Sequence, residues 1–264
     1  MLLICLAGCK HQQPPAAAKG QPVHAASGTK WKLVEEFDYS WQKGLPVHFI
    51  LEKPEPYDAP GDFTRLRLQM KGQPEFSLSN EDGWIEYNSQ EQRSPVYANL
   101  SRENLARSKY VLILPDSGDP ALSPLLFLRS WAYASDPERL HVIGFRANSK
   151  PDVIFNELFD LTEFSDVDQD GSRELVGVPC LSEDISGRNG EVTTYTPFRV
   201  YKISRPALGV AVLSLELSEA YNVRNNGGWA GAECSNEYAI YRAKNKKPRV
   251  LPVKEAQKLV TASN

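Results

Sequence analysis

Long apolar runs are missing from this 264-residue sequence, and nothing in it approaches the roughly 18 consecutive apolar residues of a membrane-spanning helix. A surplus of basic charge is also missing, because 30 Lys and Arg face 33 Asp and Glu and leave a net charge of −3. Proteins that bind nucleic acid usually carry such a surplus, so we expect no nucleic-acid partner. The composition likewise excludes collagen, coiled coil and general disorder.

Motifs of the common catalytic sites are absent as well. The sequence contains no G-x-S-x-G, no P-loop and no Cys-x-x-Cys, and it has only four histidines. His11 and His24 fall in a low-complexity segment, whereas His48 and His141 fall in expected strands, where a histidine more often packs than reacts. These absences argue against an enzyme.

Two other functions remain open. Glu35 and Glu36, or the group Glu157, Asp160 and Glu163, could supply the two carboxyl groups of a hydrolase that acts on cell-wall or carbohydrate substrates. Such pairs also arise by chance in a chain with 33 acidic residues. The other possibility is an inhibitor lipoprotein that blocks a partner enzyme through an exposed loop.

The first residues are apolar and end in Leu6-Ala7-Gly8-Cys9, which resembles the lipobox of bacterial lipoproteins. The resemblance implies that residues 1–8 are a signal peptide and that Cys9 carries the lipid. Lys10 stands where an Asp would favour retention in the inner membrane, so the resemblance implies an outer-membrane lipoprotein that faces the periplasm or the surface. We therefore expect a protein of the cell envelope, anchored to the membrane by lipid, with an envelope protein or glycan as partner.

Residues 9–29 are rich in Pro, Ala, Gln and Gly and show no hydrophobic periodicity. Such a segment cannot bury enough apolar surface to offset its ordering entropy, so we expect a disordered tether. If Cys5 is removed with the signal and Cys9 carries lipid, Cys180 and Cys234 remain. An even pair in an oxidising compartment predicts a disulfide, with two buried thiols as the alternative.

Residues 30–264 are expected to form a single mainly β domain of antiparallel sheets, of propeller-blade or sandwich type, with a few short helices. Short apolar or alternating segments separated by turn residues predict strands at 63–70, 110–114, 124–128, 139–145, 152–155, 174–178, 198–203 and 238–241. Helical spacing predicts short helices at 104–107, with Ser101 as a possible N-cap, at 215–221 and at 253–260.

The strongest chemical signal is the acidic loop 166–174. Asp166, Asp168 and Asp170 occupy alternate positions, Gly171 follows them, and Glu174 closes the loop at position 9. Alternating carboxylates can converge on one cation, and hard oxygen ligands suit Ca²⁺. The carbonyl of Ser172 would add a ligand, so we predict a structural Ca²⁺ site, with a solvated acidic turn as the alternative.

An EF-hand loop would need Glu at position 12, which is Gly177 here. Closure at position 9 instead resembles the calcium loop of FG-GAP and VCBS-type repeats, in which the loop joins two strands of a propeller blade. The loop also fits the DxDG[ST] motif of haloacid-dehalogenase-type phosphatases, but that chemistry needs a later acidic pair, and Asp184 is the last aspartate. Ten acidic residues lie between 152 and 184, whereas residues 185–264 hold twelve basic and six acidic ones. This distribution fits either a cation site or charge complementarity within the chain.

Residues 221–231 combine Asn, Gly and aromatic residues, a composition typical of binding loops. Trp229 could stack on a sugar or peptide. The alternative is that Trp229 covers the core beside Cys234.

Overall fold

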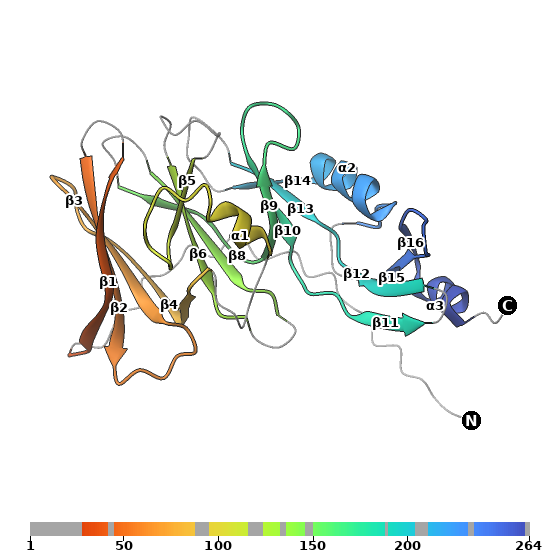
Figure 1. Ribbon diagram of the computed structural model, residues 1–264, viewed down its shortest axis with the longest axis horizontal. Coiled ribbons are helices and arrows are strands. Elements are labelled where there is room, and N and C mark those ends of the chain that lie inside the picture. The colour runs from red at the N-terminus through yellow and green to blue at the C-terminus, as the bar shows by residue number, and fades with distance from the viewer. Residues whose placement is uncertain are drawn as a thin grey trace, which may run out of the picture.

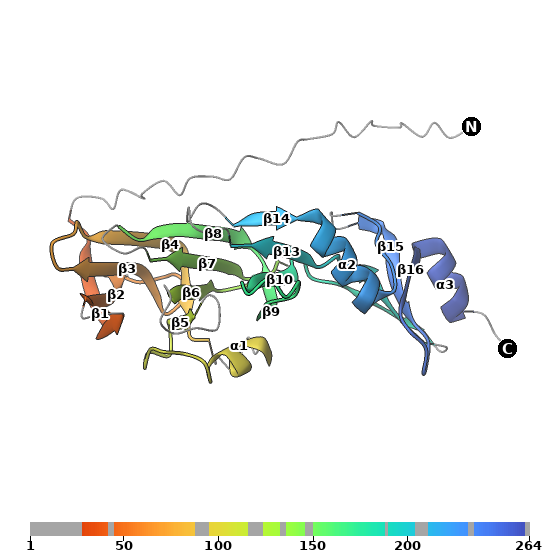
Figure 2. The same cartoon turned by 90° about the horizontal axis from the view of Figure 1, so that it is seen from above.

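The computed structural model is a mainly β protein with three antiparallel sheets and three short helices in its described residues, as predicted. The sheets follow one another along an elongated molecule (Figure 1), and the view from above shows the same order (Figure 2). The described residues are 28–41, 45–87, 95–115, 124–132, 136–145, 150–187, 190–203, 211–231 and 235–261.

The largest sheet has eight strands in the order β1-β2-β3-β4-β6-β7-β8, with β5 paired to β6. Strand β6 pairs with β7 along one edge. On its other edge, its last residues pair with the end of β4 and its first residues pair with β5. The strands are β1 (Lys30–Trp41), β2 (Leu45–Glu55), β3 (Phe63–Met70), β4 (Phe76–Ile85), β5 (Leu112–Pro115), β6 (Pro124–Ser130), β7 (Arg139–Gly144) and β8 (Asp152–Leu158).

Strands β5 to β7 are buried on both faces, which explains their continuous apolar runs. Along β6, Leu125 and Phe127 pack into one hydrophobic cluster, and Leu126 and Leu128 pack into a second one. The second cluster also contains the apolar side chains of β2, β3 and β4, so the N-terminal half of the sheet covers this face.

The second sheet has the order β14-β13-β10-β9 and lies between the large sheet and a helix. Its Phe164 and Leu175 join the first cluster of the large sheet. On its other face, Val176 and Val200 pack against Tyr221 of α2. The elements are β9 (Asp160–Ser165), β10 (Glu174–Val178), β13 (Arg199–Lys202), β14 (Val212–Ser214) and α2 (Leu215–Asn226).

The third sheet has the order β11-β12-β15-β16 and packs its own small core with the C-terminal helix α3 (Val253–Thr261). Its strands are β11 (Asp184–Gly187), β12 (Gly190–Tyr195), β15 (Ser235–Arg242) and β16 (Arg249–Pro252). None of the helices in the described part of the chain is long and apolar enough to cross a bilayer.

The prediction of a helix at 104–107 is wrong. The helix of this region, α1, lies earlier, at Pro95–Leu100. The Asn104 side chain accepts hydrogen bonds from the N–H groups of Ala106 (3.0 Å) and Ile113 (2.8 Å), which fixes a turn instead. Ser101 is not an N-cap, since its N–H donates to Tyr97 O at the end of α1.

The prediction of a loop over 221–231 is wrong in its first half. Helix α2 continues to Asn226, and Gly227 caps it with φ 71°. Asn222 holds the extension in place. Its amide donates to the carbonyl oxygens of Phe198 (2.8 Å) and Ser218 (2.7 Å), and its carboxamide oxygen accepts from the Phe198 N–H (3.0 Å). The asparagines that suggested a loop are therefore partly the link between α2 and the sheet.

Candidate metal site in the acidic loop

The acidic loop connects the neighbouring antiparallel strands β9 and β10, so the expected strand–loop–strand arrangement is present. Two residues of the loop, Gln169 (φ 64°) and Gly171 (φ 88°), adopt the left-handed conformation that lets the chain reverse sharply. Strand β13 lies on the other side of β10 and places Lys202 opposite Glu174. The loop, β10 and β13 together form the site.

Three carboxylates converge within the loop. Asp166, Asp168 and Glu174 each offer an oxygen atom, and these oxygens lie within 4.8 Å of one another. Asp166 is exposed, whereas Glu174 is only 1% exposed at the base of the loop. This cluster could hold a metal ion.

Backbone hydrogen bonds fix two of these carboxylates. Asp166 accepts from the N–H groups of Asp170 (3.0 Å) and Gly171 (2.9 Å), and Glu174 accepts from the Val167 N–H (2.9 Å). A carboxylate has about four lone-pair sites, so both retain capacity for another partner. The loop is therefore pre-organised by its own acidic side chains.

Lys202 supplies a positive charge to the same loop. Its Nζ lies 2.5 Å from Asp168 Oδ2 and 3.0 Å from Asp170 Oδ2. These hydrogen bonds raise the pKa of Lys202 and lower the pKa of Asp170. A cation from the basic C-terminal part of the chain therefore neutralises part of the acidic segment.

Asp170, a predicted ligand, is not in the carboxylate cluster. Its Oδ1 accepts from the Ser172 N–H (2.9 Å), and its Oδ2 accepts from Lys202. Asp170 thus holds the turn and the lysine. Coordination by the Ser172 carbonyl stays a prediction.

Glu174 is the member of the cluster whose ionised form is disfavoured by its surroundings. Burial raises its pKa to about 7, and the negative charges of Asp168 and Asp170 act in the same direction, although the hydrogen bond from Val167 opposes them. A divalent cation beside the carboxylate would favour its ionised form. Proton and metal would therefore compete for Glu174 near neutral pH.

The cysteines predicted to be modified are only partly described. Cys180 is disulfide-bonded. Cys9 and Cys234 lie outside the described residues, so lipidation and the pairing with Cys234 stay predictions. Trp229, three residues beyond the end of α2, is partly buried.

Two of the carboxylates considered for hydrolysis, those of Glu35 and Glu163, form hydrogen bonds within the fold. Glu35 accepts from the Ser108 hydroxyl (2.8 Å), and Glu163 accepts from the hydroxyls of Ser165 (2.5 Å) and Tyr221 (2.7 Å). The contacts with Ser108 and Tyr221 join β1 and β9 to other segments of the chain and give these two carboxylates structural partners.

The strand histidine His141 is buried against Trp84, whose indole N–H donates to His141 Nδ1 (3.2 Å). Burial lowers the pKa of His141 to about 3, with a smaller effect from Arg139. The side chain is therefore a neutral part of the core, in agreement with a packing role.

Lys202 is the member of the site that the sequence did not reveal. It lies 28 positions beyond Glu174, and only the pairing of β10 with β13 brings the two together. No local pattern signals such a contact.

No protein-family model, curated protein or solved structure matches the chain. The functional conclusions therefore rest on the residues and their geometry.

Proposed function

We propose that the protein is a lipid-anchored module of the bacterial cell envelope whose acidic loop is held by a structural Ca²⁺ ion. The observation that carries the metal site is the convergence of Asp166, Asp168 and the buried Glu174 within 4.8 Å. The Leu6-Ala7-Gly8-Cys9 motif and the Pro/Ala/Gln-rich segment after it support the anchor.

Calcium suits this donor set better than other metals. The cluster offers carboxylate oxygens without His or Cys, which disfavours zinc and copper. Oxygens on opposite sides of a Ca²⁺ ion lie about 5 Å apart, so atoms within 4.8 Å of one another can share one ion. Mg²⁺ keeps its waters and demands a smaller octahedral shell, so it should substitute poorly.

The ion would act on structure and not on a reaction. Its ligands lie at the end of β9, in the loop and at the start of β10, so one ion would join both strands. It would also displace Lys202 from Asp168, because both cations use the same carboxylate. The resemblance to FG-GAP and VCBS-type loops supports this structural role.

Thermal unfolding in EDTA and in added Ca²⁺ or Mg²⁺ tests the proposal. Ligand that binds only the folded state should stabilise the wild type by about 2.7 kcal/mol at a hundredfold excess over Kd. Asp168→Ala should lose the calcium effect, whereas Glu36→Ala, which removes an exposed carboxylate elsewhere, should keep it. Equal melting temperatures of the wild type in all conditions, with no calorimetric heat of Ca²⁺ binding, would leave Lys202 as the loop's own counter-ion and no metal site.

A further inference from the structure

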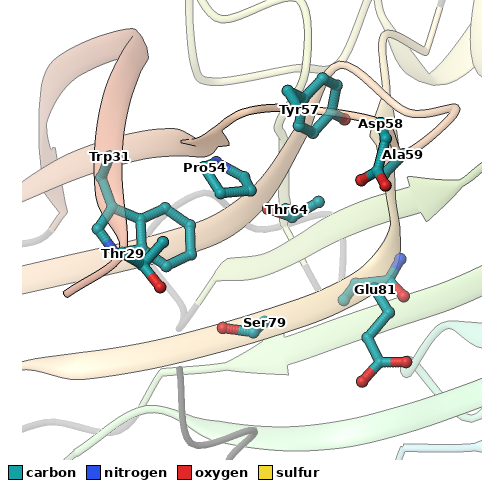
Figure 3. Close-up of a pocket in the computed structure, with 10 residues that line it drawn as sticks. Thr29, Trp31, Pro54, Tyr57, Asp58, Ala59, Thr64, Ser79 and Glu81 are labelled. Atoms are coloured by element: carbon teal, nitrogen blue, oxygen red, sulfur yellow. The ribbon is translucent and has the colours of Figure 1, made fainter. Parts of the chain in front are cut away.

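A cavity of about 260 Å³ opens on the first four strands of the large sheet, away from the acidic loop. Its lining comes from the start of β1, the end of β2, the turn after β2, and the facing parts of β3 and β4 (Figure 3). Small-molecule sites have volumes of about 300–1,000 Å³, so this cavity suits a compact ligand.

The cavity arises from a break in the pairing of β3 with β4. Phe63 pairs with Trp84, but Arg65 already pairs with Ser79, so only Thr64 stands opposite four residues of β4. These four residues, 80–83, are stabilised by a hydrogen bond within the segment: the buried Asn80 donates from Nδ2 to Gly83 O (2.9 Å). The irregularity therefore has a defined structure, as β-bulges at functional sites commonly do.

The turn after β2 forms a fixed wall of the cavity. The Tyr57 hydroxyl donates to Gly61 O, and the Gly61 N–H donates to Asp82 O (3.1 Å). Gly61 also packs closely on residues 80–83 of β4. A Cβ added at Gly61 would lie only 2.6 Å from the carbonyl carbon of Gly83. The wall is thus held in place by β4.

One side of the cavity is apolar and partly aromatic. Trp31 and Pro54 lie opposite each other on β1 and β2, and Tyr57 follows in the turn. The Arg65 guanidinium lies 3.5 Å from the centre of the Trp31 ring, and Glu52 fixes this arginine through a contact of 2.6 Å. The indole ring is therefore held in one orientation.

The other side of the cavity is polar and acidic. Asp58 and Glu81 lie across from Trp31 (Figure 3), and no basic side chain contributes to the lining. Thr64 lies between these two sides and is only 8% exposed. Among the described residues its hydroxyl oxygen has no hydrogen-bond partner, which is costly for a buried polar group.

We propose that this cavity binds one saccharide unit of a glycan. A sugar ring presents C–H groups that would pack on the Trp31 face not covered by Arg65, and hydroxyl groups that would donate to Asp58 and Glu81. Rotation of the Thr64 side chain would turn its hydroxyl, which is closed to solvent in the structure, toward the ligand.

The carboxylates of Asp58 and Glu81, with the nearby Arg65 already paired to Glu52, disfavour an anionic ligand. A wholly apolar ligand would leave Thr64 unsatisfied. A simple ammonium ion would be attracted by the carboxylates but would leave the Thr64 hydroxyl without a partner. This proposal is independent of the proposed lipid anchor and of the proposed calcium ion, because neither contributes to the lining of the cavity.

Saturation-transfer NMR of the purified full chain tests this inference with glucose, galactose, N-acetylglucosamine and their short oligomers as probes. Trp31→Ala should weaken binding about tenfold or more, because it removes the stacking surface. Thr64→Val should weaken it about threefold to tenfold, the value of one hydrogen bond, without loss of folding stability. Trp131→Ala, at a partly buried tryptophan that does not line the cavity, is the matched control and should leave the affinity unchanged.

Thr64→Val keeps the test decisive if Trp31→Ala proves unstable, because no bond of the fold uses the lost hydroxyl. Failure of every saccharide to bind the wild type would overturn the inference. Binding that survives both cavity variants would overturn it too. A third contrary result is binding of tetramethylammonium, used as a cationic probe, with no competition from any sugar.

Discussion

Lys202 Nζ lies 2.5 Å from Asp168 Oδ2, at the loop where the sequence predicts a divalent cation. The lysine and a metal ion would compete for the same carboxylate, since both need its negative charge. Lys202 can stabilise the loop when metal is scarce, and it must move when metal binds. Its contribution would set how much of the proposed calcium the loop requires.

Lys202→Met should therefore raise the affinity for Ca²⁺ by about tenfold, which corresponds to about 1.4 kcal/mol of removed competition. It should also lower the melting temperature in EDTA, because Asp168 and Asp170 lose their partner. Calorimetric titration measures the first effect, with the exposed Lys254→Met as control. An unchanged or weaker Ca²⁺ affinity would show that the lysine does not occupy the metal's place.

The pH dependence of stability should depend on Glu138, which is buried between Tyr97 of α1 and Arg129 of β6. Burial raises its pKa from 4.5 to about 7. The protonated form is therefore favoured in the folded state, so its stabilising effect is complete below pH 4.5 and is lost as the pH rises through 7.

Between these pH values the wild type should lose up to about 3 kcal/mol of unfolding free energy through this group. Glu138→Gln keeps a hydrogen-bond acceptor for Tyr97 but cannot ionise, so its stability should fall less over the same range. Urea unfolding at pH 5 and pH 8 measures the difference, with Glu36→Gln as the exposed control. Parallel losses in wild type and Glu138→Gln would refute the assignment.

Gly61→Ala should destabilise the fold by about 2–4 kcal/mol, because its Cβ would collide with the backbone of Gly83. Gly72→Ala is a useful comparison, since Gly72 has φ 76° but nothing within 4 Å of an added Cβ. That variant should show only the conformational cost of about 1–2 kcal/mol. Equal unfolding free energies for the two variants would mean that the turn can move away from β4.

Cys9→Ser should abolish lipidation and release the protein from the membrane fraction. The reason is that the thiol is the attachment point implied by the resemblance to the lipobox. Fractionation of cells that express each form, with Cys5→Ser as the neighbouring control, measures the effect. If Cys9→Ser sediments with membranes as the wild type does, the lipoprotein assignment is wrong.

Alkylation of the unreduced, unfolded protein should leave Cys180 unlabelled, and peptide mapping should find it linked to Cys234. The disulfide-bonded state of Cys180 supports the first part, and an even cysteine pair in an exported chain supports the second. A linkage of Cys180 to Cys5 or Cys9 would contradict the predicted pairing.

The strands of the centre of the molecule were predictable because burial on both faces produces unbroken apolar runs. Residues 124–128 and 139–145 correspond to β6 and β7 for this reason. Strand β1 was not predicted, since an irregularity between Leu33 and Glu35 interrupts its alternation. Leu33 is exposed, whereas Phe37 and Tyr39 beyond the irregularity pack on the core. A bulge depends on the partner strand, which a local pattern does not contain.

The acidic loop was predictable in part for a similar reason. Asp166, Asp168 and Glu174 come together within one turn of chain, so their spacing alone indicates convergence. The orientation of Asp170 depends on Lys202, which reaches the loop only through strand pairing. The cavity depends on four separate strands and a break in their register. A sequence motif cannot indicate a site of this kind, because its residues come together only when the strands pair.

The position of Trp31 has a mechanical consequence. It is the second residue of β1, so in the tethered protein proposed above a held glycan and the anchor pull on the same end of the molecule. The tension would pass through the first pairs of β1 and β2, Lys30 opposite Glu55 and Trp31 opposite Pro54, and would leave the rest of this ladder unloaded. The two smaller sheets lie outside this load path.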